Sequence, residues 1–366
     1  MLISNFSEDK PSVEIKHLEK VVDSRKNEFM KEIKFKRSKL ELYLKKENGI
    51  FPENFELGEF IGSGAESLVF KAESKKTKKE IIAKMLYRKK GEKTNVEEIE
   101  ITKKLKNKNI IESYGAFPVK QSELDCILLE DAKYGDLRNF SMKLLKKAFL
   151  TESLLCYICY QILNGLKYIH LCKIVHFDLK PQNIVIDEYL NVKIIDFSVS
   201  LHYGKRKDKR IKLRILGTSF YIAPELIKEE TIDIKDLNKV DLYSLGVMLY
   251  NLAYGNYPYG LKSEDSKNYY KILDEIEKNN LEFPNEENFY SPYFNDFLKK
   301  ILEKDIHKRI HISEAMEHYW VKGANILFNE KEKMYNAGIF LGNLITDSFK
   351  SFNDYINNES KIFLSN

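Results

Sequence analysis

The chain has 366 residues, of which 43% are hydrophobic and 31% charged, and its formal net charge is +5. This length exceeds what one compact core usually holds, so we expect two lobes or domains with extensions. No apolar run is long enough to cross a bilayer, and the basic residues are spread along the chain. The composition therefore argues against a membrane span and against a nucleic-acid-binding protein.

The first residues lack the basic-then-apolar layout of a signal peptide, and the last ones carry no prenylation motif. We therefore expect a cytoplasmic protein. Of four cysteines, Cys156 and Cys159 form a CxxC pair, but it lies in an apolar helical stretch without a second pair or a histidine cluster. Buried structural thiols are expected there rather than zinc or a disulfide.

Residues 1–54 mix lysine and glutamate with regularly spaced apolar residues, which predicts an amphipathic helical extension. From Phe55 to Asp131, short β-rich runs predict strands at 57–61, 68–72, 81–86 and 127–129, with one helix at 95–105. This part therefore reads as a small sheet with one main helix.

After Gly135 the pattern becomes mainly helical, with helices predicted at 151–170, 239–253 and 296–302 and short strands at 184–186 and 192–195. Residues 322–366 are too apolar for a typical disordered tail and are predicted to form a packed C-terminal extension.

Several weak signals occur along this pattern. Gly62 and Gly64 lie on a predicted β-turn-β whose backbone could close over phosphates, and Lys84 lies on an apolar strand. Each alone is weak, because hairpin glycines usually only form a turn.

A second group of polar residues follows the predicted helix at 151–170. The run from His176 to Asn183 joins a carboxylate, a cation and an amide, which are groups that orient a hydroxyl, neutralise phosphate charge and hold a metal. Asp196 ends an apolar strand, where a further magnesium ligand would be needed, although a capping aspartate is the simpler interpretation of that residue alone.

The order and spacing of these elements resemble the eukaryotic protein kinase family over roughly residues 55–321. Further matches are Gly217-Thr218-Ser219-Phe220-Tyr221-Ile222-Ala223-Pro224-Glu225, Asp241-Leu242-Tyr243-Ser244-Leu245-Gly246 and Asp305-Ile306-His307-Lys308-Arg309. The resemblance implies an α+β, bilobal fold with a β-rich N-lobe (55–131) and a larger, mainly helical C-lobe (132–321). ATP and Mg²⁺ would be the cofactors.

By that resemblance, Lys84 would hold the α- and β-phosphates while paired with a helix glutamate, for which Glu98 fits the apolar pattern better than Glu97. Leu129 would be the gatekeeper beside the adenine. The remaining implied nucleotide-binding positions are Ile61, Gly62, Gly64, Val69, Glu130, Ala132, Asp136 and Val185.

The same resemblance implies the catalytic positions. Asp178 matches the aspartate that accepts the substrate hydroxyl proton, and Asn183 and Asp196 match the metal ligands. Lys180 and Thr218 match the serine/threonine subclass, so protein serine and threonine hydroxyls are the expected acceptors.

Three further matches concern architecture rather than chemistry. Glu225 and Arg309 match a buried ion pair of the large lobe, and Asp241 matches the residue that braces the catalytic loop.

The chain departs from the family pattern around its activation loop. Phe177 replaces the arginine that usually precedes the catalytic aspartate, and between Ser200 and Thr218 the only phosphorylatable hydroxyl is that of Tyr203. Phosphorylation orders such loops because the added phosphate, with a charge of about −1.5 to −2, binds to a cluster of arginines. We therefore predict activity without activation-loop phosphorylation.

The same loop is rich in lysine and arginine. This basic run could attract an acidic substrate or regulator, serve as a nuclear address, or be a solvated flexible loop. Ser198 replaces the glycine that usually follows Asp196-Phe197, and a residue with a Cβ resists positive φ.

Two alternatives to a strict serine/threonine kinase remain open. A pseudokinase scaffold would keep the fold without phosphoryl transfer, but Lys84, Asp178, Asn183 and Asp196 are all present. A dual-specificity kinase would accept tyrosine as well. The oligomeric state and the physiological substrate are not readable from these residues.

Overall fold

The computed structural model describes residues 54–64, 67–88, 96–119, 124–145, 150–204, 206–213, 215–262, 265–266, 268–284 and 290–324. The predicted helix at 1–54 and nearly all of the C-terminal extension lie outside these residues. The chain divides into two compact units, one formed by residues up to 90 with 117–127, the other by 91–116 with 128–366.

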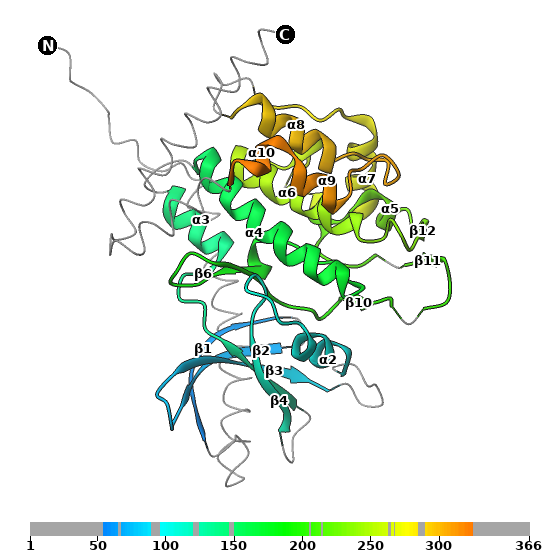
Figure 1. Ribbon diagram of the computed structural model, residues 1–366. Coiled ribbons are helices and arrows are strands. Elements are labelled where there is room, and N and C mark those ends of the chain that lie inside the picture. Colours follow the sequence, from blue (N-terminus) through cyan, green and yellow to red (C-terminus); the bar gives the residue numbers. More distant parts are fainter. Residues whose placement is uncertain are drawn as a thin grey trace, which may run out of the picture. The chain divides into compact units, whose positions relative to one another are not determined.

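The first unit contains most of an antiparallel sheet with strand order β1-β2-β3-β5-β4 (Figure 1), while residues 113–116 of β4 and 128–130 of β5 belong to the second unit. The strands are β1 (Phe55–Ser63), β2 (Ser67–Ser74), β3 (Glu80–Tyr87), β4 (Ser113–Val119) and β5 (Leu124–Glu130). Alternate residues of β2 are buried, namely Leu68, Phe70 and Ala72, which is the period expected of a strand with one covered face.

Strand β4 was not predicted from the sequence. It contains Gly115 and Pro118, residues that usually weaken or end a strand. The strand order places β4 at the edge of the sheet. Proline has no N–H to donate, and an edge strand tolerates it because the side without a neighbouring strand needs no donor.

The second unit is mainly helical. Its helices are α2 (Val96–Lys104), α3 (Leu137–Leu145), α4 (Glu152–Leu171), α5 (Pro224–Ile227), α6 (Lys239–Tyr254), α7 (Tyr269–Lys278), α8 (Pro292–Ile301), α9 (Ile312–Glu317) and α10 (Tyr319–Lys322). Three 3₁₀ turns lie at Pro181–Asn183, Ser219–Tyr221 and Pro258–Gly260. A sheet part and a helical part confirm the predicted α+β class.

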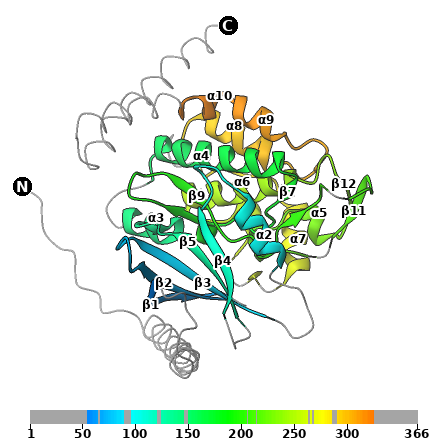
Figure 2. The ribbon, with the colours of Figure 1, turned by 60° about the horizontal axis from the view of Figure 1, so that its bottom comes forward.

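Helices α4 and α6 form the centre of this unit and lie side by side (Figures 1 and 2). Helix α4 begins after Thr151, whose side chain accepts a hydrogen bond from the N–H of Leu154. Helix α6 ends at Gly255, which adopts a left-handed conformation with φ of 71°. Both helices are apolar on nearly all sides because other elements of the unit surround them.

Short strand pairs hold the loops between these helices. They are β6 (Gly135–Asp136), β7 (Ile174–Val175), β8 (Ile184–Ile186), β9 (Val192–Ile194), β10 (Leu201–His202), β11 (Arg210–Lys212) and β12 (Thr231–Asp233). Strands β6, β8 and β9 form one small sheet, β7 pairs with β10, and β11 pairs with β12. These ribbons fix the segments that carry the predicted catalytic residues.

The cysteines are free thiols, and three of them, Cys126, Cys156 and Cys159, are buried as predicted. Burial raises the pKa of each of these three thiols. Across the described helices, none is long and apolar enough to span a membrane. The described residues also contain no cluster of three or more histidine, cysteine, aspartate or glutamate side chains able to bind a metal ion.

Candidate active site

The loop that follows β7 is anchored from below by a buried carboxylate. Asp241, on α6, accepts hydrogen bonds from the backbone N–H groups of His176 (3.0 Å) and Phe177 (2.9 Å), and its Oδ2 lies 2.9 Å from the Nε2 of His170. Burial alone would raise the pKa of Asp241, but the hydrogen bond and charge of His170 hold that pKa below its usual value. The predicted bracing role of Asp241 agrees with this geometry.

Three predicted catalytic side chains and one predicted metal ligand meet in one hydrogen-bond network. Lys180 Nζ lies 2.6 Å from Asp178 Oδ2 and 2.7 Å from Thr218 Oγ1. The Thr218 hydroxyl donates to Asp178 Oδ1 at 2.7 Å. Asn183 Nδ2 donates to the backbone oxygen of Asp178 at 2.8 Å and to its Oδ2 at 3.0 Å. Residues far apart in sequence thus fix the orientation of a single carboxylate.

Asp196 lies two residues after the end of β9 (Val192–Ile194). Before it, the backbone N–H of Ile195 donates to the oxygen of Asn183 at 2.9 Å, which ties the residue after β9 to the 3₁₀ turn at 181–183. After it, Phe197 is 1% exposed and meets the His176 ring edge-on at 5.3 Å. Contacts of both neighbours therefore hold the backbone around Asp196.

Positive φ angles in this region occur at two residues other than Ser198. Ser198, in the usual glycine position, has no positive φ, whereas Asp196 has a φ of 68° and Phe177 a φ of 64°. Aspartate tolerates the left-handed region better than most residues, but the bulky Phe177 is a true outlier there. Its surroundings must therefore hold it in place.

Gly217 explains part of that constraint. Its φ is +98°, and a Cβ at this position would collide with the backbone oxygen of Phe177. Phe177 itself is 3% exposed and belongs to the hydrophobic core of the second unit. The position that carries an arginine in many kinases is here a packing position.

The segment between Asp196 and Thr218 is held by strand pairing at two places. Leu201 and His202 pair with Val175 and Ile174, and residues 210–212 pair with 231–233. Tyr203, the hydroxyl that the sequence left as the only candidate for phosphorylation, is 7% exposed, and its N–H donates to the oxygen of Lys173 at 2.9 Å.

In the first unit, three predicted nucleotide-binding residues share one row across the sheet. Gly62 on β1 is opposite Val69 on β2, which in turn is opposite Lys84 on β3. Side chains directly opposite each other on neighbouring strands project from the same face. The register therefore places Val69 and Lys84 next to each other on one face of the sheet.

Several predicted nucleotide-binding residues belong to the second unit. Leu129 and Glu130 end β5, Ala132 lies between β5 and β6, and Asp136 and Val185 lie on the small sheet. Asp136 is opposite Val185 in the β6–β8 pair. The Asp136 carboxylate accepts hydrogen bonds from the N–H of Asn139 (2.9 Å) and from its side-chain amide (2.6 Å), which caps the start of α3. Asp136 therefore has a structural partner that the sequence pattern did not reveal.

Two glutamates compete for the helix position predicted to pair with the strand lysine. Glu98 is buried (7% exposed), whereas the neighbouring Glu97 is exposed and accepts a hydrogen bond from the N–H of His202 at 3.3 Å. The polar Thr102 that this alignment leaves in an apolar position donates to the oxygen of Glu98 at 2.7 Å. The burial favours Glu98.

Comparison with known proteins matches residues 55–321 to the family model described as protein kinase domain. The chain belongs to the protein kinase family. It is 34% identical over 275 residues to "Serine/threonine-protein kinase TIO" of Arabidopsis thaliana, covering 74% of this chain but 19% of that relative. It is 31% identical over 274 residues to an "Aurora kinase" of Schizosaccharomyces pombe, covering 73% and 71%. An "Aurora kinase" of Dictyostelium discoideum is 28% identical, and the match spans 66% of its length.

These matches confirm the family, its serine/threonine subclass and the bilobal kinase fold predicted from the motifs. The chain spans from about a fifth to about seven tenths of these relatives' lengths. The predicted site residues are not tested by the comparisons and stay predictions.

The kinase domain also contains the predicted buried ion pair. Arg309 donates to the two carboxylate oxygens of Glu225 at 2.6 and 3.0 Å, and its guanidinium lies 4.9 Å from the centre of the Tyr243 ring. Burial lowers the pKa of Arg309, but the charge and hydrogen bonds of Glu225 outweigh it and raise the pKa above its usual value. The pair links α5 to the loop before α9.

Sequence reasoning missed two residues that shape the kinase site. His170, the partner of Asp241, is the next-to-last residue of α4, and Gly217 gives the backbone room beside Phe177. Gly217 could have been recognised from the sequence, because it begins one of the matched motifs. Nothing in the sequence marked His170, because a histidine at the end of an apolar helix usually has no special role.

Proposed function

We propose that the protein is an ATP-dependent serine/threonine protein kinase that transfers the γ-phosphoryl group of Mg-ATP to protein hydroxyls. The observation that carries the proposal is the network of Asp178 with Lys180, Thr218 and Asn183, at 2.6 to 3.0 Å. Phosphoryl transfer needs positioning and charge neutralisation more than covalent chemistry, and this network supplies both.

Each member of the network has a defined task in the proposal. Asp178 accepts the proton of the attacking serine or threonine hydroxyl. Lys180 places a positive charge beside the carboxylate, where the transferred phosphoryl group would develop negative charge. Thr218 connects the two, since its hydroxyl donates to Asp178 and accepts from Lys180.

The magnesium ligands of the proposal are Asn183 and Asp196, whose oxygens suit a hard cation. The amide nitrogen of Asn183 is already directed at Asp178, so the amide oxygen points away from that carboxylate. This orientation fits metal binding by the oxygen. When bound, magnesium would neutralise phosphate charge.

The nucleotide-binding residues of the proposal are those that the resemblance to the kinase family implies. Lys84 would hold the phosphates, Glu98 is the helix glutamate of the proposal, and the row that includes Gly62 and Val69 supports a phosphate-covering face. The backbone groups of Glu130 and Ala132 would bond the adenine. The proposal also includes Ile61, Gly64, Leu129, Asp136 and Val185.

We also propose that activity does not require phosphorylation of the activation loop. Phe177 takes the place of the usual phosphate-binding arginine and lies in the hydrophobic core. Tyr203 is buried, and the segment around it is already held by the β7–β10 and β11–β12 pairs. Backbone pairing would then supply the order that a phosphate supplies elsewhere.

The expected partners are protein substrates with acidic residues near the acceptor, or an acidic regulator. The described part of the activation segment exposes a set of basic side chains that would favour such a partner through charge. The set is Arg206, Lys207, Lys209, Arg210 and Lys212.

The test is transfer of labelled γ-phosphate from Mg-ATP to casein and myelin basic protein by phosphatase-treated protein. The treated wild type and Tyr203→Phe should both be active, and Asp178→Asn should lose nearly all transfer while retaining ATP binding. Phosphoamino-acid analysis of the product should show phosphoserine and phosphothreonine. Equal signals from wild type and Asp178→Asn would contradict the assigned base, and loss on phosphatase treatment would contradict loop independence.

A further inference from the structure

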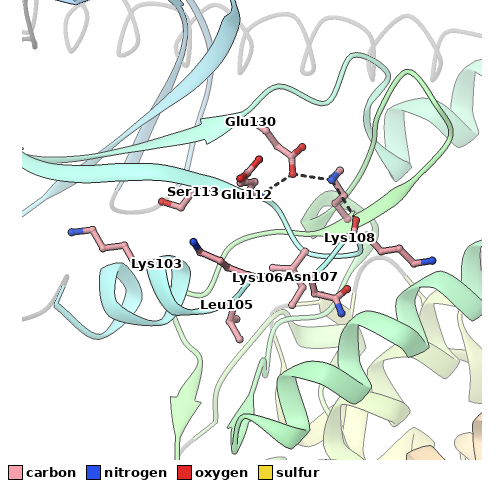
Figure 3. A pocket seen from close by; sticks show the side chains of 10 residues that line it. Lys103, Leu105, Lys106, Asn107, Lys108, Glu112, Ser113 and Glu130 are labelled. Carbon is pink, nitrogen blue, oxygen red and sulfur yellow. Dashed lines mark hydrogen bonds and ion pairs between the residues drawn. The ribbon is translucent and has the colours of Figure 1, made fainter.

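A pocket of about 360 Å³ lies where the loop after α2 meets the ends of β4 and β5 and the middle of β9 (Figure 3). All of its lining belongs to the second unit, so it is formed within one compact body. None of its residues belongs to the catalytic network described above. Its chemistry is strongly basic, because four lysines and two glutamates line it.

The walls of this pocket are fixed by backbone hydrogen bonds. The N–H of Ile111 donates to the oxygen of Ile194 at 3.1 Å, and the N–H of Glu130 donates to the oxygen of Glu112 at 3.0 Å. On the other side, the N–H of Lys106 donates to the hydroxyl of Tyr168 on α4 at 3.3 Å. A preformed wall lowers the ordering cost of binding a ligand.

One lysine and one glutamate of the lining neutralise each other. Lys193 Nζ lies 2.9 Å from Glu130 Oε1 and also donates to the backbone oxygen of Lys108 at 3.3 Å. The same Glu130 oxygen accepts the N–H of Glu112 at 2.7 Å. Glu130 is therefore occupied as an acceptor and contributes little net negative charge to the pocket.

The rest of the lining is mainly basic. Lys103 and Lys106 are exposed lysines of the α2–β4 loop region, and Glu112 is the exposed carboxylate beside them in the lining. Among the described residues, no carboxylate lies within ion-pair distance of Lys103 or Lys106. An anion would match these two lysines.

The pocket also contains a hydroxyl that lacks a partner. Ser113 Oγ is shielded from solvent and makes no hydrogen bond within the described part of the chain. A buried hydroxyl without a partner is costly, so a ligand that accepts its proton would gain by binding there. Figure 3 shows the Lys106 ammonium on the same side of the pocket as this hydroxyl.

We propose that this pocket binds a phosphate monoester, with Lys106 and Ser113 as its main donors. A phosphate carries a charge of about −1.5 to −2 and three strong acceptor oxygens, which suits two lysines that have no carboxylate partner among the described residues and a hydroxyl that has no hydrogen-bond partner there. Lys103 points outward in Figure 3, and its flexible stem allows its ammonium group to turn toward a bound anion.

The test measures fluorescence anisotropy of a labelled alanine peptide that carries one phosphoserine, titrated with the full chain. The phosphopeptide should bind, and the unphosphorylated peptide should not. Lys106→Gln should weaken binding about tenfold, and Ser113→Ala should weaken it about fivefold, because each removes one donor to a charged acceptor. Both variants should keep basal phosphoryl transfer.

Lys104→Gln is the matched control, since Lys104 is an exposed neighbour that does not line the pocket. It changes the net charge equally and should leave binding within twofold of the wild type. An equal loss in Lys104→Gln and Lys106→Gln would mean non-specific attraction and would overturn the proposal. Displacement of the peptide by Mg-ADP would overturn it too, by placing the peptide at the nucleotide site.

Competition with inorganic phosphate identifies the source of the ligand. Displacement at concentrations similar to those of unlabelled phosphopeptide supports a small free phosphate compound as the occupant. Displacement only by the phosphopeptide supports a phosphorylated protein segment. A glutamate peptide that binds as tightly as the phosphopeptide would refute the phosphate assignment.

Discussion

Replacing Thr218 by valine should slow phosphoryl transfer without disturbing nucleotide binding. Valine keeps the branched shape of threonine but removes the hydroxyl that connects Lys180 Nζ to Asp178 Oδ1, at 2.7 Å on each side. A hydrogen bond to a charged group contributes about 1.5–3 kcal/mol. If that energy orients Asp178 in the transition state, the turnover number should fall about 10- to 200-fold.

The assay is steady-state phosphorylation of casein, with kcat and the KM for ATP measured separately. Thr218→Ser keeps the hydroxyl and should retain most of the wild-type kcat, whereas the KM for ATP should change little in either variant. A valine variant within about threefold of the wild type would refute the assigned positioning role. Equal loss in the serine and valine variants would show that the hydroxyl alone does not account for the effect.

Three further predictions concern stability, measured by chemical denaturation. Gly217→Ala should lower the free energy of unfolding by about 1–3 kcal/mol, because the new Cβ would be strained by the positive φ and would clash with the backbone oxygen of Phe177. Gly255→Ala should lower it less, because a Cβ there would meet no other atom. Equal losses of unfolding free energy in the two variants would contradict the clash. Arg309→Met should lower the free energy of unfolding by about 3–5 kcal/mol, because it leaves the Glu225 carboxylate buried without its partner. Adding Glu225→Leu removes that buried charge and should restore part of the lost stability. A double variant no more stable than Arg309→Met would contradict this explanation. Burial raises the pKa of Glu152, and this effect outweighs the hydrogen bonds that lower it. The free energy of unfolding should therefore fall as pH rises from about 4.3, the pKa of an unfolded glutamate, through the higher folded pKa. Glu152→Gln should remove that pH dependence of the unfolding free energy, and an unchanged pH dependence would refute the assignment.

The family and the main helices were predictable because both show in short stretches of sequence, as motifs and as apolar periodicity. The ranges predicted at 151–170 and 239–253 agree with α4 (Glu152–Leu171) and α6 (Lys239–Tyr254), whose long apolar runs leave little choice of structure. The motif around Asp178 was identifiable because a carboxylate, a cation and an amide occur within one short stretch.

Strand β4 could not be predicted from the same kind of pattern. Gly115 and Pro118 argue against a strand locally, and only the edge position in the sheet makes them acceptable. The hydrogen-bond partners of Asp136 and Asp241 could not be predicted from the sequence either. Asn139 is close in sequence but was one of many polar neighbours, and His170 lies far from Asp241 along the chain.

The sequence by itself determined that this chain belongs to the protein kinase family, since the order and spacing of motifs can be read without knowledge of their contacts. Tertiary structure alone decided that Phe177 is a packing residue with positive φ, that Tyr203 is buried, and that Thr218 bridges Asp178 and Lys180. The physical reason is that burial and hydrogen bonding between distant segments depend on how those segments pack. No local pattern of residue types encodes that packing.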